Sequence, residues 1–240
     1  MTPFGMNLGI GLMCKRPAPG VSKTRLAAVV GAERAAVLAE AFLLDSAALA
    51  RLTAQREHAA ITGFFTPADA GEAMAVLLPG WMLEPQTEGD LGARMGHALD
   101  RLFAQGASAA MLIGTDAPTL PPALIELMLA ALRSGADAAC IPALDGGYCS
   151  IAFARPPFVR SGPALLENMP WSTPGLLEAT RARASAEGLR FDILPAWHDV
   201  DEAEDLALLR RTLAGEALPG CSPLPPFRAS ATRRALQLIE

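Results

Sequence analysis

Short apolar runs alternate with longer segments of helical periodicity along most of the chain, and this alternation limits the possible folds more than any other feature. The short runs have strand character, and we expect strands at 7–14, 59–66, 81–84, 109–114, 137–142, 148–154 and 190–195. Strands that alternate with helices of about 10–20 residues indicate a mainly parallel sheet with helices on both faces. The sequence therefore predicts a three-layer αβα protein of the α/β class, with a mostly parallel mixed sheet.

Helical spacing of apolar residues and capping residues place the helices between these strands. We expect helices at 32–52, 67–69, 91–103, 123–133, 174–186 and 202–213. Asp90 and Thr173 are expected N-caps, and Asp201 with Glu204 forms a capping-box-like pair. Residues 1–215 are predicted to form one domain. Residues 216–240 are predicted to be a proline-rich tail, with a short helix at 228–238.

Composition excludes several classes of protein. A hydrophobic fraction of 51% with 19% charged residues can fill a core, which argues against disorder. A net charge of −5 disfavours nucleic acid as a partner. The widely spaced cysteines, and the lack of a basic start or of an apolar run of about 18 residues, favour a cytoplasmic protein without a membrane span. The sequence does not indicate an oligomeric state.

A basic loop follows the first expected strand. Four cations fall within residues 15–25, together with Pro17, Pro19 and Gly20. Lys15 and Lys23 are the only lysines among 240 residues, whereas arginine occurs 18 times. A loop between a strand and a helix presents backbone N–H groups and cations, which suit polyphosphate. The alternative is a solvated surface loop.

Carboxylates follow two other expected strands. Asp116 ends an apolar strand, where a carboxylate needs a cation or a hydrogen-bond partner. Asp199 and Asp201 flank Val200, so an extended backbone would point both to one side. Because ligands bind at the carboxyl ends of parallel strands, these acids and the basic loop should meet at one edge. Mg²⁺, or Mn²⁺, is the cofactor expected there, although Asp201 can equally be a helix cap. His198 is either a further ligand or structural.

The remaining candidates lie in loops that could contact a base or an acceptor. Gly89 and Gly92 would let the backbone approach a planar base, with Gln86 or Glu88 as hydrogen-bond partners, although Gly-Asp is also ordinary turn chemistry. Asp145 precedes a Gly-Gly turn and is a candidate general base for an acceptor hydroxyl. Tyr148, the only tyrosine, and Trp171 could contact the substrate, although Trp171 is at least as well explained by core packing.

These motifs resemble a bacterial family of nucleotide-diphospho-sugar transferases with the glycosyltransferase-A fold. The motifs, which span about residues 7–210, are Lys15-x-Pro17-x-Pro19-Gly20-x-x-Lys23-Thr24-Arg25-Leu26, Gln86-x-x-Gly89-Asp90-Leu91-Gly92-x-Arg94-Met95, Gly114-Thr115-Asp116-x-Pro118, Asp145-Gly146-Gly147-Tyr148, Trp171-Ser172-Thr173 and Asp199-Val200-Asp201-x-x-x-Asp205-Leu206. The layout is also similar to the molybdenum-cofactor and phospholactate guanylyltransferases. In the latter, the resemblance implies that a Lys-Thr-Arg-Leu loop serves a triphosphate and that acids matching Asp116, Asp199 and Asp201 hold Mg²⁺.

The candidate site residues follow from these motifs. The catalytic candidates are Lys23, Arg25, Asp116 and Asp145. The nucleotide- and phosphate-binding candidates are Lys15, Gly20, Lys23, Thr24, Arg25, Gln86, Gly89, Asp90, Gly92 and Arg94. The acceptor candidates are Gly146, Gly147, Tyr148, Trp171, Ser172 and Thr173. Ala117, Cys149 and Glu202 depart from residues frequent in the family, and these departures bear on acceptor recognition rather than on the metal.

Three functions are open at this point. The first, which is our leading hypothesis and which the family resemblance favours, is a Mg²⁺-dependent glycosyltransferase that uses a nucleotide-diphospho-sugar and a small-molecule acceptor. The second is a guanylyltransferase-like nucleotidyltransferase that releases pyrophosphate, and two lysines and an arginine in one loop favour this triphosphate chemistry. The third is a nucleotide-binding module without catalytic activity.

Overall fold

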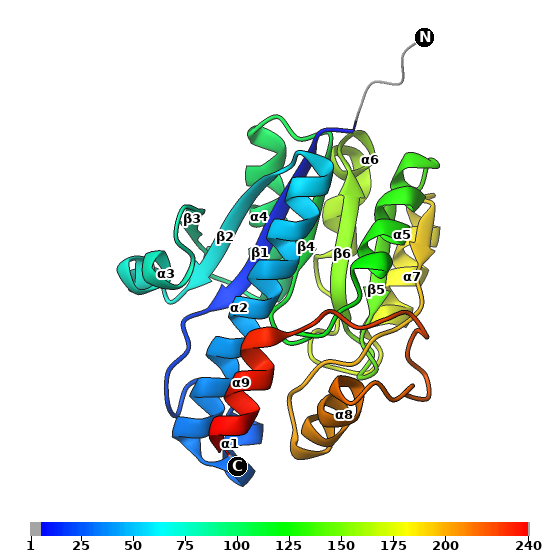
Figure 1. Cartoon of the computed structure of the whole chain (residues 1–240). Helices are drawn as coiled ribbons and strands as arrows, with labels where there is room; N and C mark the ends of the chain where they lie inside the picture. The colour runs from blue at the N-terminus through cyan, green and yellow to red at the C-terminus, as the bar shows by residue number, and fades with distance from the viewer. Residues whose placement is uncertain (1–5, 240) are drawn as a thin grey trace.

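A seven-stranded sheet forms the centre of the computed structural model, which describes residues 6–239 (Figure 1). The strands are β1 (Leu8–Lys15), β2 (Ala60–Thr66), β3 (Met82–Pro85), β4 (Ala109–Ile113), β5 (Ala138–Pro142), β6 (Tyr148–Ala154) and β7 (Phe191–Ile193). Their order is β3-β2-β1-β4-β6-β5-β7. Only β6 runs antiparallel to its neighbours β4 and β5 among the described strands, and the other pairings are parallel. The predicted α/β class and mostly parallel mixed sheet are confirmed.

Helices cover both faces of this sheet. They are α1 (Thr24–Val30), α2 (Ala32–Glu57), α3 (Gly71–Leu77), α4 (Leu91–Ala104), α5 (Pro122–Arg133), α6 (Arg155–Ser161), α7 (Leu176–Ala186), α8 (Ala203–Leu213) and α9 (Ser230–Ile239), with 3-10 turns η1 (Ala68–Ala70) and η2 (Gly162–Leu165). On one face α2 packs on β1 and β2, and α5 packs on β5 and β6. On the other face α4 and α6 pack around Phe153 and Phe158. Burial of these apolar faces holds the three layers together.

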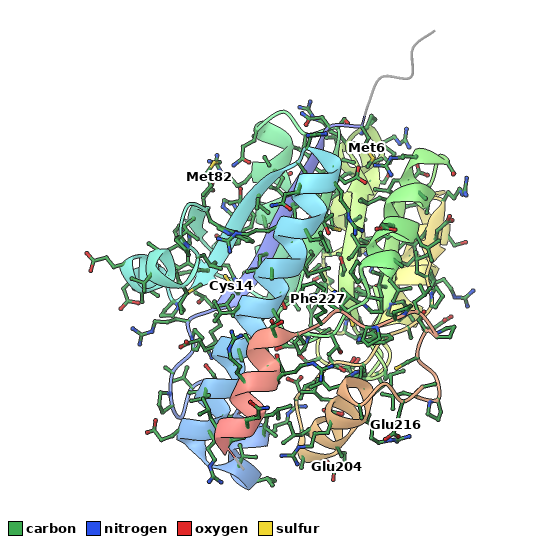
Figure 2. All side chains as sticks on the ribbon, viewed as in Figure 1. Met6, Cys14, Met82, Glu204, Glu216 and Phe227 are labelled. Carbon is green, nitrogen blue, oxygen red and sulfur yellow. The ribbon has the colours of Figure 1, made fainter. Side chains whose placement is uncertain are left out.

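A third apolar cluster lies beside the sheet, where α1, α2, α8 and α9 meet. It joins Leu26 and Phe42 to Val200, and α9 adds Leu236 and Ile239. Figure 1 shows α9 alongside α2, with the chain from α8 to α9 running across the molecule. Phe227, labelled in Figure 2, ends this connecting segment and packs against the cluster around β1 and α5. The helix expected in the C-terminal tail is therefore present and packed against the rest of the chain.

Two of the expected helix caps are wrong and one is confirmed. Asp90 caps α4, because its side chain accepts a hydrogen bond from the N–H of Ala93 at 2.8 Å. Thr173 does not cap α7, which begins at Leu176 after Gly175, and the Thr173 hydroxyl donates to the carbonyl of Pro170.

The cap of α8 is Glu202 rather than Asp201. Glu202 and Asp205 form the capping box of this helix, and the expected pairing with Glu204 is not the one observed. Asp201 lies one residue before the cap, so its carboxylate is free for another partner.

Sequence periodicity missed two helices and shortened a third. α1 follows directly on the basic loop, α6 begins with two prolines, and α2 extends to Glu57 instead of ending near residue 52. Within residues 6–239, no helix combines the length and hydropathy that a membrane crossing needs.

Candidate active site

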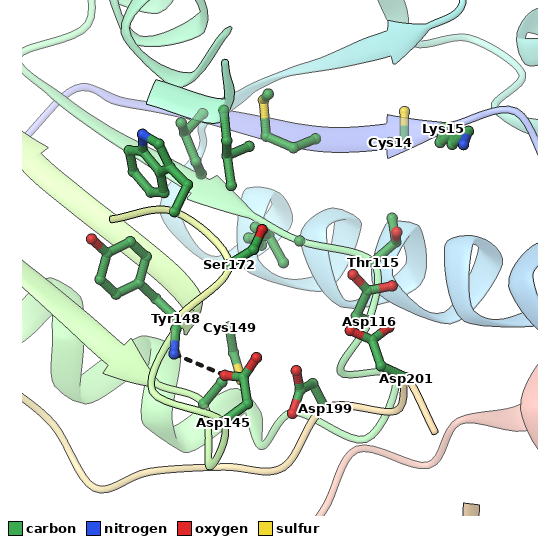
Figure 3. A pocket seen from close by; sticks show the side chains of 18 of the residues that line it. Cys14, Lys15, Thr115, Asp116, Asp145, Tyr148, Cys149, Ser172, Asp199 and Asp201 are labelled. Carbon is green, nitrogen blue, oxygen red and sulfur yellow. Dashed lines mark hydrogen bonds between the residues drawn. The ribbon is translucent and has the colours of Figure 1, made fainter. Parts of the chain in front are cut away.

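A cavity of about 580 Å³ opens at the edge of the sheet where β1 and β4 end. Its walls come mainly from the loops that follow the strands, at residues 13–15, 21–25, 112–116, 143, 145, 147–151, 171–173, 176, 199 and 201. Further lining residues come from α2, from α4 and from the ends of β2 and β3. Figure 3 shows the carboxylates of Asp116, Asp145, Asp199 and Asp201 along one side of this cavity. The structure thus brings together the basic loop and the acids that lie far apart in the sequence.

Lys23 makes the direct contact between the basic loop and the acids. Its Nζ donates hydrogen bonds to Oδ1 of Asp116 and, at 2.7 Å, to Oδ1 of Asp201. The Lys23 side chain is 8% exposed, whereas the side chains of Asp116 and Asp201 are 52% and 39% exposed. The ring of Phe42 lies 5.7 Å from the ammonium, close enough for a cation–π contact. Lys23 is therefore buried beneath two carboxylates that still face the cavity.

The charge on Lys23 is maintained by these acids. Burial alone would lower the pKa of the Lys23 ammonium, but the charges and hydrogen bonds of Asp116 and Asp201 outweigh it and raise that pKa. Lys23 also has a left-handed backbone, with φ of 48°, at the residue that precedes α1. A non-glycine residue in this region is strained, so the surrounding structure must hold it there.

Two other cations of the loop, Lys15 and Arg25, are held by protein groups as well. The Nζ of Lys15 donates to the carbonyl of Val21 at 2.9 Å, which closes the loop on itself. Arg25 pairs with Glu202 at 3.1 Å, and both side chains are exposed. Thr24 lines the cavity beside them. Glu202, which sequence reasoning noted only as a departure from the family pattern, thus joins the basic loop to the start of α8.

Backbone contacts fix the two acidic segments against each other. The N–H of Val200 donates to the carbonyl of Asp116 at 2.9 Å, and the side chain of Val200 is fully buried in the third apolar cluster. Asp199 and Asp201 on either side of Val200 both line the cavity, as the alternation of an extended backbone predicts.

Asp199 lies close to other carboxylates, and within residues 6–239 no cation pairs with it. Burial, and then the charge of Asp145, raises the pKa of the Asp199 carboxyl to about 7. Asp145 accepts a hydrogen bond from the N–H of Gly147 at 2.8 Å, which fixes its carboxylate at the cavity edge (Figure 3).

The acids fit a divalent cation through Asp116 and Asp201. Within the described part of the chain, no three aspartate, glutamate, histidine or cysteine side chains are grouped closely enough to hold a metal ion, so the expected trio with Asp199 is not preassembled. Asp116 and Asp201 already share one cation, the Lys23 ammonium. Mg²⁺ commonly binds through one or two carboxylates together with substrate phosphates, so this pair is a sufficient protein contribution.

The segment expected to contact a base divides into two groups. Gln86 and Arg94 line the cavity, whereas Gly89, Asp90 and Gly92 are not among its lining residues within 6–239. The same holds for Gly20 of the basic loop and for the acceptor candidate Gly146. The Gln86 side-chain nitrogen donates to the carbonyls of Phe64, at 2.8 Å, and of Cys14, at 3.1 Å. Its position is therefore fixed by the ends of β1 and β2.

Gly92 serves the packing of α4. A Cβ at Gly92 would lie 2.0 Å from the carbonyl oxygen of Leu166 and 2.9 Å from the indole of Trp171. Gly92 is therefore explained by close packing on Trp171, and the indole becomes one wall of the cavity.

Among the acceptor candidates, Tyr148 lies on the opposite side of the cavity from Lys15 (Figure 3). The Tyr148 hydroxyl bonds to the hydroxyl of Thr180 at 2.6 Å, and its ring meets Trp171 edge-on at 6.4 Å. Gly147, Ser172 and Thr173 line the cavity next to them. Gly146, with φ of 94°, is needed where the chain passes Pro174, since a Cβ there would lie 2.3 Å from the Pro174 carbonyl oxygen.

Two further residues complete this description. His198 is buried, and its Nε2 bonds to Thr212 at 2.9 Å and Thr119 at 3.3 Å, which supports the structural alternative. Thr115 lines the cavity beside Asp116 and was missed as a candidate (Figure 3). Its position directly after a buried strand is the signal that could have identified it.

Comparisons with known proteins agree with this architecture. The model of a family described as an uncharacterized protein conserved in bacteria, DUF2064, matches residues 49–173. A candidate nucleotide-diphospho-sugar transferase from Desulfovibrio desulfuricans is 33% identical, with a TM-score of 0.81 and coverage of 97% of this chain and 96% of that one. A search of curated proteins gave no match.

More distant solved structures share the fold alone. A 4-diphosphocytidyl-2C-methyl-D-erythritol synthase from Anaerococcus prevotii is 12% identical, with a TM-score of 0.55 and coverage of 86% of this chain and all of that one. A CMP:2-keto-3-deoxy-manno-octonic acid synthetase complexed with CTP is 13% identical, with a TM-score of 0.54 and coverage of 88% and 100%.

The fold is that of the nucleotide-diphospho-sugar transferases, and the Desulfovibrio protein is a transferase by description. Within that class, the chain belongs to the bacterial family DUF2064. The resemblance inferred from the sequence motifs is confirmed.

Proposed function

We propose that the protein is a Mg²⁺-dependent glycosyltransferase that takes a sugar from a nucleotide-diphospho-sugar. One observation carries the proposal: the basic loop after β1 and the acids after β4 and β7 line a single cavity. Cations suit a diphosphate, and carboxylates suit the metal that accompanies it. The likeness to the Desulfovibrio protein supports this choice of donor.

The state of the cations favours a diphosphate over a triphosphate. Lys23 is shared by two carboxylates, and Arg25 is paired with Glu202. Lys15 is bonded to a neutral carbonyl, and no acid within residues 6–239 pairs with its ammonium. Before a substrate binds, the loop therefore offers less free positive charge than its sequence suggests, which weakens the argument for triphosphate chemistry.

In this proposal each group acts on a stated part of the substrates. Lys15, Lys23 and Arg25 would hold the diphosphate, and Asp116 and Asp201 would hold Mg²⁺, with Asp199 as the third candidate ligand. Magnesium supplies neutralisation of the charge that grows on the leaving diphosphate. The acceptor oxygen bonds to the sugar carbon, and the bond from that carbon to the phosphate oxygen breaks. Asp145 takes the acceptor proton, and the nucleoside diphosphate leaves with the electron pair.

Nucleotidyl transfer is the second candidate, because a cytidylyltransferase from Leptospira borgpetersenii, 14% identical with a TM-score of 0.54, shares the fold. In that reaction an acceptor oxygen attacks the α-phosphorus of a nucleoside triphosphate, and pyrophosphate leaves. The two reactions release different phosphorus compounds, so product analysis separates them.

The test is ³¹P NMR of the products. The protein is incubated with Mg²⁺ and, in turn, with UDP-glucose, GDP-mannose, CTP and GTP, where slow transfer to water reports the donor even without an acceptor. We expect release of a nucleoside diphosphate from a nucleotide-sugar, and its loss in Asp116→Asn. Pyrophosphate release without nucleoside diphosphate would establish the second candidate instead.

A matched control separates these outcomes from misfolding. Asp69→Asn changes an exposed aspartate on η1 outside the cavity and should leave turnover unchanged. If Asp116→Asn keeps the circular dichroism spectrum and full nucleotide binding, and wild type shows no turnover of any donor, the chain is a binding module without catalysis.

A further inference from the structure

The arrangement around Lys23 carries an inference about how the metal enters the site, and it rests on the proposed function. The Lys23 ammonium lies between Asp116 and Asp201, which come from loops after two different strands. A divalent cation bridging the same two carboxylates would need the space that this ammonium occupies. Lysine and metal therefore compete for one pair of oxygen ligands.

We propose that Lys23 is a resident counter-ion that keeps the metal out of the empty site, and that the divalent cation enters only with a nucleotide diphosphate. The ammonium neutralises Asp116 and Asp201 before substrate arrives. When the phosphates enter, Lys23 transfers its contacts to them and leaves the two carboxylates to the metal.

The burial of Lys23 is the physical reason for this coupling. Its side chain is 8% exposed, so an ion that displaced it without a phosphate present would leave a buried ammonium with no anion beside it. Loss of one partner from a buried pair is strongly unfavourable. A phosphate that arrives with the metal supplies the missing anion. The Lys23 ammonium then pairs with the phosphate, and the two carboxylates pair with the metal.

A purely structural role explains these contacts less well. A buried ion pair contributes little stability on average, and Lys23 additionally has a strained left-handed backbone. The two acids that it binds are about half exposed and face the cavity, where structural partners would be covered. The strain at Lys23 and the exposure of its two partners both favour a functional role for this contact.

The chain offers an unusually simple probe, because Lys15 and Lys23 are its only lysines. Protein labelled with ¹³C at the lysine ε-carbon should give two side-chain NMR signals, which Lys23→Met and Lys15→Met assign. Mg²⁺ is added alone, then UDP, GDP, CDP or ADP, then both together.

We expect Mg²⁺ alone to leave the Lys23 signal unchanged. A nucleoside diphosphate with Mg²⁺ should shift both signals. A shift of the Lys23 signal with Mg²⁺ alone would overturn the inference. If Lys15 responds to a nucleotide with Mg²⁺ but Lys23 does not, the inference fails while the proposed function stands. If neither lysine responds to any of the four nucleotides, both fail.

A direct metal titration gives a second, independent measurement. Binding of Mn²⁺ without nucleotide is followed by the electron paramagnetic resonance signal of the free ion. Removal of the competing ammonium in Lys23→Met should tighten Mn²⁺ binding about tenfold, a typical size for coupling between ligands. Arg56→Met removes an exposed cation that does not line the cavity, and it should leave this metal binding unchanged. Equal Mn²⁺ affinity in wild type and a folded Lys23→Met variant contradicts the inference.

Discussion

Asp201 and Glu202 show how one residue of register decides between a structural and a chemical role. Both are acids before α8, and either satisfies the sequence pattern of a helix cap. In the structure Glu202 has the extended backbone of an N-cap, with φ of −124° and ψ of 177°, and forms the capping box with Asp205. Asp201 is left to bind Lys23, which a sequence pattern alone does not reveal.

Gly92 and Gly96 offer a prediction at the same scale, because both lie on α4 with different surroundings. Alanine at Gly92 would meet the Leu166 carbonyl at 2.0 Å, whereas alanine at Gly96 has its nearest neighbour at 3.9 Å. Gly92→Ala should destabilise the protein by about 1–3 kcal/mol through overpacking. Gly96→Ala should stabilise it by about 0.5–1 kcal/mol, because glycine in a helix is entropically costly.

Urea unfolding of both variants measures this difference directly. Gly92→Ala should also weaken ligand binding, since the same clash moves Trp171 at the cavity wall. Equal stabilities of the two variants would mean that α4 shifts freely against Leu166, and that Gly92 has no packing role.

At the scale of elements, α9 supports the site although none of its residues lines the cavity within 6–239. Its apolar face packs into the third cluster, which also contains Leu26, Phe42 and Val200. Leu26 follows the basic loop and Val200 separates Asp199 from Asp201. The C-terminal helix thus braces the two segments that must face each other for the site to form.

Asp45 on α2 fixes the start of α9. Its two carboxylate oxygens accept hydrogen bonds from the N–H groups of Ala231, at 3.0 Å, and Thr232, at 2.7 Å. Asp45→Ala leaves those two donors without a partner from α2, and should cost about 1–3 kcal/mol of unfolding free energy. Hydrogen exchange should show faster exchange at residues 230–239.

Glu40→Ala is the matched control, because Glu40 is exposed on the same helix. It should leave the unfolding free energy within about 0.5 kcal/mol of wild type, and it should leave the hydrogen-exchange rates of α9 unchanged. If Asp45→Ala leaves hydrogen exchange in α9 unchanged, the capping of this helix from α2 is not what holds it in place.

At the scale of the whole molecule, sequence periodicity predicted the sheet far better than the side-chain geometry of the site. All seven strands begin and end within about two residues of expectation, because each is a short apolar run bounded by turn residues. α6 was missed because two prolines at its start resemble a loop, although proline is tolerated in a first helical turn.

For the site as well, the sequence predicts which loops meet but not which side chains bond to each other. Ligands bind at the carboxyl ends of parallel strands, and this rule predicts that the loops after β1, β4 and β7 meet. The structure brings these loops together around one cavity. That Lys23 would bond to Asp116 and Asp201 does not follow from the rule, since it depends on one left-handed residue. The packing role of Gly92 depends on Leu166 and Trp171, which are more than 70 residues away in the sequence.

The most direct test asks whether the cations of the basic loop and the carboxylates of Asp116 and Asp201 form one site. It is a calorimetric titration with UDP, GDP, CDP and ADP, each with and without Mg²⁺. For the nucleotide that binds, Mg²⁺ should tighten wild-type binding about tenfold or more, and most of that gain should be lost in Asp116→Asn. An equal effect of Mg²⁺ in both proteins, or no effect in wild type, would contradict the account.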